Sequence, residues 1–125
     1  MHLFFREEIS EVLQTPTGEK IYELVGKSPG TGGADLHSLA LVVIPPGKAS
    51  SRHYHKIAEE SYYLLKGEAR MEIAGETIHL RPGQGLLIEP GEVHRISNPG
   101  KVDLEFLAVC APPWQPEDSY EVGKS

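Results

Sequence analysis

Glycine recurs at intervals of eight or nine residues through the second half of the chain, at Gly67, Gly75, Gly83, Gly91 and Gly100. The segments between these glycines have the length of strands, and several alternate apolar with polar residues. Short strands joined by glycine and proline turns at such a spacing indicate an all-β sandwich or barrel. No stretch of ten or more residues shows the periodicity of an amphipathic helix, so the predicted fold class is all-β.

The alternation is clearest in two of these segments. Ala69, Met71 and Ile73 occupy every second position between charged residues, and residues 103–110 alternate in the same manner. Since successive side chains of a strand point to opposite faces, each strand is predicted to bury one face and expose the other. Residues 37–44 are apolar and β-branched and predict a further strand.

The two ends of the chain carry weaker patterns. Residues 20–25 alternate and predict a strand, residues 3–5 predict an edge strand, and residues 7–13 predict a short helical turn. Residues 28–35 are rich in glycine and predict a loop. The tail, residues 112–125, contains three prolines and is predicted to lie along the surface.

Length and composition limit the possible functions. A chain of 125 residues indicates one domain, which can bury a core without disulfides or metal. The formal net charge of −6 and the scattered Lys and Arg residues argue against a nucleic-acid partner. A single cysteine, Cys110, excludes an internal disulfide framework and fits a reducing compartment. No apolar run approaches the ~20 residues of a membrane span, and the N-terminus lacks signal-peptide features. We therefore expect a soluble, cytoplasmic protein with no membrane partner.

Two histidines one residue apart, His53 and His55, suggest a metal site. On a strand, both imidazoles point to the same side. A following strand that begins with Glu59 and Glu60 can bring a carboxylate against that face, and His94 follows a turn further along the chain. Imidazole and carboxylate together suit a divalent transition metal such as Mn, Fe, Ni or Zn.

These residues belong to a motif that resembles the first motif of the cupin superfamily. It runs from Gly47 over five residues to His53-x-His55, over four more to Glu60, and over six more to Gly67. The six residues before Gly67 match the family spacing and favour Glu60 over Glu59 as a ligand.

A second stretch is similar to the second motif of the superfamily. It contains Gly83, Glu89-Pro90-Gly91, His94 and Asn98. It departs from the family pattern at Glu89, where the family has proline, although Pro90 lies beside it. The resemblance covers roughly residues 38–110.

The resemblance implies a double-stranded β-helix, which is a small jelly-roll barrel of about residues 37–110 with its site inside the mouth. It also implies the metal ligands His53, His55, Glu60 and His94. Cupins include oxygenases, isomerases, epimerases, decarboxylases, sugar binders and storage proteins, so the fold alone does not fix a reaction.

The predicted substrate pocket is apolar. Its expected inward residues are Tyr62, Leu64, Met71, Ile96 and Phe106. Tyr62 and His37 are the only candidates for a general acid or base, and Cys110 is expected to be a small buried apolar residue.

The leading interpretation is a metal-dependent oxygenase, of the dioxygenase type, acting on a small apolar or aromatic substrate that chelates the ion through oxygen. A sugar or sugar-phosphate isomerase or epimerase that uses the metal as a Lewis acid is the first alternative, and a non-catalytic module for a small ligand is the second. No nucleotide-binding motif is present in the sequence. A homodimer is expected through the apolar residues 3–5.

Overall fold

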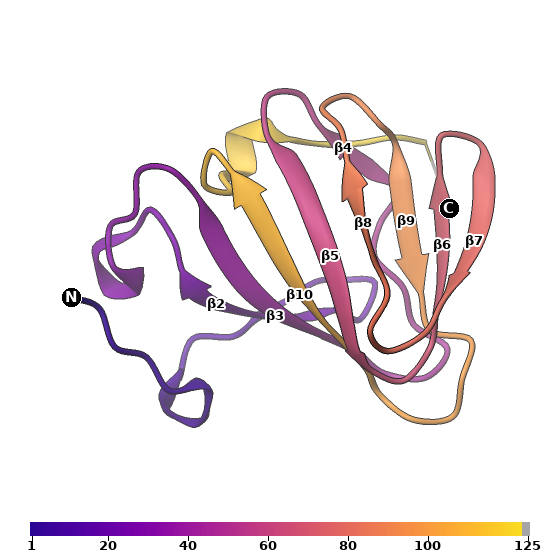
Figure 1. Ribbon diagram of the computed structural model, residues 1–125, viewed down its shortest axis with the longest axis horizontal. Helices are drawn as coiled ribbons and strands as arrows, with labels where there is room; N and C mark the ends of the chain where they lie inside the picture. Colours follow the sequence, from indigo (N-terminus) through magenta and orange to yellow (C-terminus); the bar gives the residue numbers. More distant parts are fainter. Residues whose placement is uncertain (124–125) are drawn as a thin grey trace.

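The computed structural model describes residues 1–123, which form two antiparallel β-sheets packed face to face (Figure 1). The first sheet has six strands in the order β1-β2-β3-β10-β5-β8, and the second has five in the order β11-β4-β9-β6-β7. The strands of the first sheet are β1 (Leu13–Gln14), β2 (Lys20–Val25), β3 (Ser38–Ile44), β5 (Glu59–Lys66), β8 (Gly85–Ile88) and β10 (Leu104–Ala111). Those of the second are β4 (His53–His55), β6 (Ala69–Ile73), β7 (Glu76–Leu80), β9 (His94–Ser97) and β11 (Ser119–Glu121). The predicted all-β class is confirmed.

Three single-turn 3-10 helices complete the described part of the chain: η1 (Arg6–Glu8), η2 (Pro29–Thr31) and η3 (Pro116–Asp118). No helix within residues 1–123 combines the length and the apolar character that crossing a membrane requires. The loop between β5 and β6 depends on Gly67, whose φ of +81° is disfavoured for other residues. A Cβ on this glycine would also lie 2.7 Å from the carbonyl oxygen of Asp103, so the turn excludes any side chain there.

The core lies between the two sheets and is made by the alternation that the sequence shows. In β5, every second residue from Glu60 to Leu64 is buried. Met71 and Ile96 are buried on the facing sheet. Side chains such as Leu64 and Phe106 are fully buried. Burial of each such side chain contributes about 1.5–3 kcal/mol to folding.

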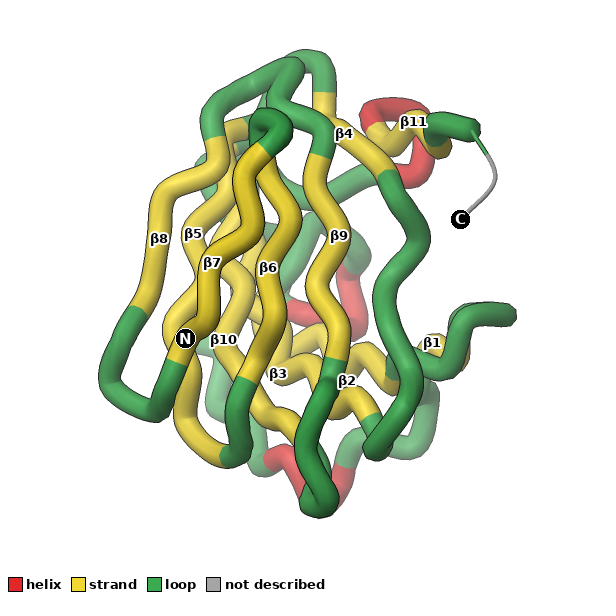
Figure 2. The backbone as a smooth tube through the Cα atoms, turned by 90° about the vertical axis from the view of Figure 1, so that its right-hand side faces the viewer, coloured by secondary structure: helices red, strands yellow, loops and turns green. Residues whose placement is uncertain are grey.

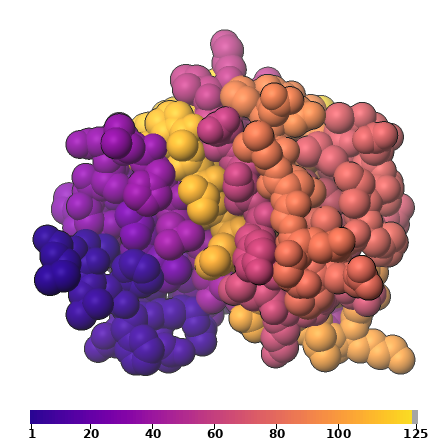
Figure 3. Space-filling model, in the orientation of Figure 1, coloured from indigo at the N-terminus to yellow at the C-terminus, as the bar shows by residue number. Residues whose placement is uncertain are grey.

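Two predictions for the N-terminal half are wrong. Residues 3–5 form no strand but an extended segment with Leu3 and Phe5 exposed, and the predicted helical turn is limited to η1. Figure 3 shows this N-terminal segment (indigo) at the opposite end of the molecule from β6 and β7. The strand predicted from residue 37 begins instead at Ser38, and His37 is exposed.

The C-terminal tail also differs from the prediction. It does not simply cover the surface but supplies β11, which pairs with β4 and extends the second sheet (Figure 2). Tyr120 lies opposite Tyr54, and their rings stack with centroids 5.2 Å apart. The strand that carries His53 and His55 is therefore held between β9 and the tail.

Candidate metal centre and cavity

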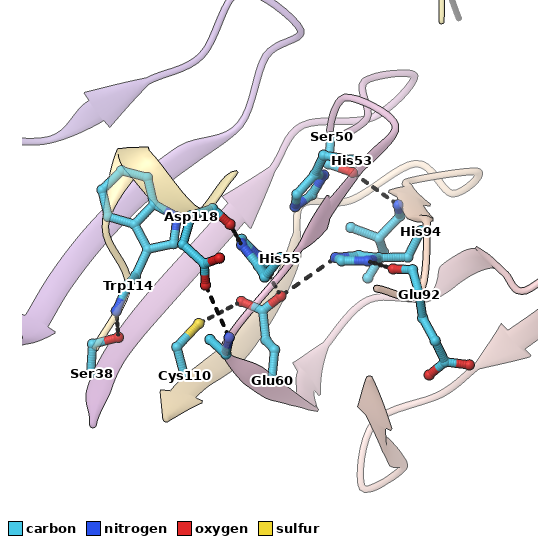
Figure 4. Close-up of polar contacts among 12 residues, drawn as sticks. Ser38, Ser50, His53, His55, Glu60, Glu92, His94, Cys110, Trp114 and Asp118 are labelled. Atoms are coloured by element: carbon cyan, nitrogen blue, oxygen red, sulfur yellow. Dashed lines mark hydrogen bonds and ion pairs between the residues drawn. The ribbon is translucent and has the colours of Figure 1, made fainter. Parts of the chain in front are cut away.

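Four side chains from three strands converge on one point between the sheets (Figure 4). His53 and His55 come from β4, His94 from β9, and Glu60 from β5 in the opposite sheet. One nitrogen or oxygen atom of each residue lies within 4.8 Å of the others. Because His53 pairs directly with His94 in the ladder, two imidazoles face Glu60 from neighbouring strands. The structure thus brings together the four residues expected as ligands.

Backbone carbonyl groups fix the orientation of all three imidazoles. A carbonyl oxygen only accepts hydrogen bonds, so the Nδ1 atom that faces it carries the proton. The Nε2 atom then keeps its lone pair, which is the state that binds a metal. The three hydrogen bonds run from His53 to Ser51 at 2.9 Å, from His55 to Asp118 at 3.1 Å, and from His94 to Glu92 at 2.9 Å.

The free Nε2 atoms point at a carboxylate oxygen. Oε1 of Glu60 lies 3.3 Å from Nε2 of His55 and 3.4 Å from Nε2 of His94. Within residues 1–123, Oε1 of Glu60 and Nε2 of His94 are buried without a hydrogen-bond partner. Buried acceptors that face one another without a proton are costly, and a cation among them removes that cost. The residues therefore fit a divalent transition metal, for which three imidazoles and a carboxylate are suitable ligands.

The protonation states of His53 and Glu60 agree with this arrangement. Burial, and after it the nearby His94, lowers the pKa of His53 to about 4, so His53 is neutral at pH 7. Burial alone would raise the pKa of Glu60, but the adjacent imidazoles of His55 and His94 and the hydrogen bond from the thiol of Cys110 hold it well below its usual range. Glu60 is therefore ionised, as a ligand must be. Burial alone would lower the pKa of His55, but the Glu60 carboxylate raises it above its ordinary value, so an ion bound there displaces a proton.

The tail holds the loop between β4 and β5. The carboxylate of Asp118 accepts hydrogen bonds from the backbone N–H groups of Lys56, Ile57 and Ala58, each at 2.9 Å. Its carbonyl oxygen is the partner of His55 described above. One residue of the tail therefore positions both a candidate ligand and the loop that leads to the next one.

A cavity of about 810 Å³ opens beside His53, His55 and Glu60. Its walls come from the N-terminal segment between residues 10 and 23, from β3 and β10, and from the tail. Trp114 lines it, and the backbone N–H of this residue donates to the hydroxyl of Ser38 at 2.9 Å. Such a volume accommodates a small organic molecule rather than only an ion and water.

The predicted pocket residues are placed differently. Tyr62 lines the cavity, and its ring packs against Phe106 with centroids 4.6 Å apart. The other four expected residues are fully buried between the sheets and do not reach the cavity wall, because the inward positions deeper in a small barrel fill its interior. These four are Leu64, Met71, Ile96 and Phe106.

His37 is also not part of the cavity. It is exposed, and β3 turns the alternate set of side chains inward, namely Ser38, Ala40 and Val42. Neighbouring positions of a strand face opposite sides, so the prediction that His37 faces the site is wrong by one position. It cannot act as an acid or base at this site.

Glu19 is a cavity residue that the sequence did not indicate. It precedes β2, and its backbone N–H donates to the hydroxyl of Thr15 at 3.1 Å. Burial, and after it the negative charge of Glu60, raises the pKa of Glu19 from 4.5 to about 7. The N-terminal segment shows no pattern that predicts such a position.

The chain matches a known sequence family. The family profile described as "Cupin domain" matches residues 40–110. An uncharacterised protein of Methanocaldococcus jannaschii is 35% identical over 105 residues, which are 84% of this chain and 82% of that protein. The polyketide synthase CurC of Streptomyces cyaneus is 34% identical over 85 residues, which are 68% of this chain and 55% of that protein. The chain thus spans most of the first relative and about half of the second.

Solved structures agree on the fold and differ in activity. The polyketide cyclase RemF of Streptomyces resistomycificus has a TM-score of 0.80 at 21% identity, covering 100% of this chain and 87% of that chain. An oxalate decarboxylase of Lactobacillus farciminis and a sugar phosphate isomerase of Silicibacter pomeroyi have TM-scores of 0.77 and 0.69 at 24% and 22% identity. At these identities the similarity concerns the fold alone, which is the double-stranded β-helix that the sequence resemblance implied.

Proposed function

The chain belongs to the cupin family, and on this premise we propose that it is a metal-dependent enzyme whose small organic substrate binds in the cavity beside the cluster of His53, His55, Glu60 and His94. The observation that carries the proposal is the set of buried acceptor atoms. A carbonyl orients each of the three imidazoles, and Nε2 of His55 and of His94 faces the Glu60 carboxylate. Four protein ligands leave positions free on a six-coordinate ion, which distinguishes a reactive site from a closed structural one.

The leading reaction class is an oxygenase, for which Fe or Mn at this site supplies the redox chemistry. The chain contributes a shielded pocket, since Ile21, Val42 and Trp114 are among the apolar residues that line the cavity. These apolar side chains would limit the access of water to the reacting groups. Tyr62 remains a phenol, because burial and then the charge of Glu60 raise its pKa, and it can donate a hydrogen bond to a substrate oxygen.

A sugar or sugar-phosphate isomerase is the alternative, since a protein described as a sugar phosphate isomerase has the same fold. The same four ligands would hold a redox-inactive ion as a Lewis acid. The uncharged cavity residues that such a sugar requires are present, including Thr15, Ser38 and Ser119. The two reaction classes therefore differ in the ion more than in the protein residues.

Metal replacement tests the proposal. Protein purified without added metal is first analysed for bound elements, and Fe(II), Mn(II) and Zn(II) forms are then assayed for O₂ uptake with small phenols and diketones and for sugar isomerisation. Turnover with Fe or Mn but not Zn supports the oxygenase, and sugar turnover that survives with Zn supports the isomerase. If a compound binds every metal form and none converts it, the protein is a ligand-binding module instead.

We also propose that the protein forms a homodimer. The N-terminal segment carries three exposed apolar side chains, Leu3 at 89%, Phe4 at 40% and Phe5 at 59% exposure. Covering them with a second copy removes apolar surface from water. The contact would be made by side chains of an extended segment and not by the edge strand predicted from the sequence.

A further inference from the structure

The cavity beside the cluster has a strongly one-sided charge. Five glutamates line it, and no Lys or Arg of residues 1–123 does so. These glutamates are Glu11, Glu19, Glu23, Glu60 and Glu121. Glu19, whose pKa is raised to about 7, carries only part of a negative charge at pH 7, and a divalent ion at the cluster offsets two charges more. The cavity still keeps an excess of carboxylates.

The basic residues that adjoin a candidate ligand in sequence are Arg52, Lys56 and Arg95, and none of them lines the cavity. Arg52 and Arg95 both pair with Glu72, at 3.3 and 3.1 Å, and none of these three residues lines the cavity. They therefore cannot neutralise an anion in the cavity.

The other residues that line the cavity indicate which further chemical groups the ligand carries. Apolar side chains such as Ile21, Val42 and Trp114 lie beside hydroxyl groups of Thr15 and Ser38. Carboxylates accept hydrogen bonds from hydroxyl and amino groups but repel other anions. The volume of about 810 Å³ is also suited to a molecule with one or more rings and far exceeds a dianion of the size of oxalate.

We propose that the cavity selects a ring-containing organic molecule that carries hydroxyl or amino groups and no negative charge, and that Glu11, Glu19 and Glu23 exclude anions such as dicarboxylates and sugar phosphates. The proposal rests on the proposed function only in taking this cavity as the substrate site. It narrows that function, because it removes phosphorylated sugars and small organic acids from the substrates. Repulsion by a carboxylate a few ångströms away in a partly shielded cavity weakens the binding of an anion by about tenfold or more.

Two fluorescent probes that differ by one sulfonate group provide the test. N-phenyl-1-naphthylamine is uncharged, and 1-anilinonaphthalene-8-sulfonate carries the same rings with one negative charge. Trp114, the single tryptophan of the chain, lines the cavity, so quenching of its fluorescence reports binding there. The affinities of both probes are measured at low salt for the wild type, for the cavity variant E11Q/E19Q/E23Q and for the control variant E59Q/E76Q/E89Q, whose three glutamates are exposed and do not line the cavity.

We expect the neutral probe to bind at least ~10-fold more tightly than the sulfonate in the wild type and the control variant. In the cavity variant the affinity for the sulfonate should increase at least ~10-fold, while the affinity for the neutral probe changes little. Equal gains in the cavity and control variants overturn the proposal, as does a sulfonate that binds the wild type as tightly as the neutral probe. The absence of Trp114 quenching by either probe overturns it as well.

Metal analysis of the same samples separates this proposal from the proposed function. If the probes show charge selection but no metal is bound, the metal-dependent enzyme is refuted and the charge-selective cavity stands. If metal is bound but the probes show no charge selection, the metal-dependent enzyme stands and the charge-selective cavity is refuted.

Discussion

The thiol of Cys110 donates a hydrogen bond to Oε2 of Glu60 at 3.0 Å across the β5–β10 ladder. Oε1 of the same carboxylate faces His55 and His94, so the thiol fixes which oxygen turns towards the imidazoles. Burial raises the pKa of Cys110 far above its usual range, which keeps the proton available for donation. The residue expected to be merely apolar therefore orients a candidate ligand.

Replacing Cys110 should change metal affinity according to the donor that remains. Cys110→Ser keeps a hydroxyl donor and should bind metal almost as well as the wild type, whereas Cys110→Ala should lose about 10-fold in affinity. Competition with a chromophoric chelator measures both. Equal affinities of the alanine variant and the wild type would show that the thiol does not position the carboxylate.

Two adjacent glutamates offer a matched test of the metal site. Glu60 is buried in the cluster, and Glu59 is exposed on the other face of β5. Glu60→Gln should lose most of the bound metal, whereas Glu59→Gln should retain it. Elemental analysis after gel filtration gives the metal content, and circular dichroism confirms that both variants keep their β-structure. Loss of metal from Glu59→Gln but not from Glu60→Gln would show that Glu59 is the ligand and that Glu60 is not.

Asp118→Ala should destabilise the protein by about 1–3 kcal/mol, because three backbone N–H groups of the β4–β5 loop lose their acceptor. For a chain of this size this corresponds to a decrease in Tm of several degrees. Thermal denaturation measures the change, and the exposed neighbour Glu117, replaced by alanine, is the control. Similar Tm values for the two variants would contradict the role assigned to Asp118.

The metal-free protein should lose stability as pH rises because of Glu19. Its pKa is about 7 in the folded state against an ordinary value of 4.5, so between these values the folded state binds a proton that the unfolded state lacks. This contribution is complete below pH 4.5, is lost as pH rises to 7, and is at most about 3 kcal/mol. The free energies of unfolding of Glu19→Gln and the wild type are measured at pH 5 and pH 8. Relative to the wild type, the variant should be more stable at pH 8 than at pH 5. A difference that does not depend on pH would refute the assignment.

Light scattering at micromolar concentration should report a particle of twice the 13.7 kDa of one chain. The double variant Leu3→Ser/Phe5→Ser should shift the particle towards one chain, because it removes apolar surface that the partner covers. A wild-type particle of 13.7 kDa would exclude the homodimer.

The sequence predicted what depends on local order and missed what depends on distant contacts. The period of two in β4 places His53 and His55 on one side, and the alternation in β5 distinguishes Glu60 from Glu59. Asp118 is 63 residues from His55, so nothing in the sequence near the histidine shows its carbonyl partner. The prediction that His37 faces the site failed for another reason. Neighbouring residues of a strand point to opposite faces, so an error of one position places a side chain on the wrong face.

The order in which the chain is synthesised gives the pairing of β11 with β4 a further consequence. All four residues of the cluster lie between His53 and His94, but His55 obtains its carbonyl acceptor only from Asp118. A nascent chain that has reached His94 therefore possesses every candidate ligand but still lacks the carbonyl group that accepts the hydrogen bond from His55. Asp118 is synthesised after all four candidate ligands, so an ion acquired before it would meet a set of ligands in which His55 lacks its carbonyl acceptor.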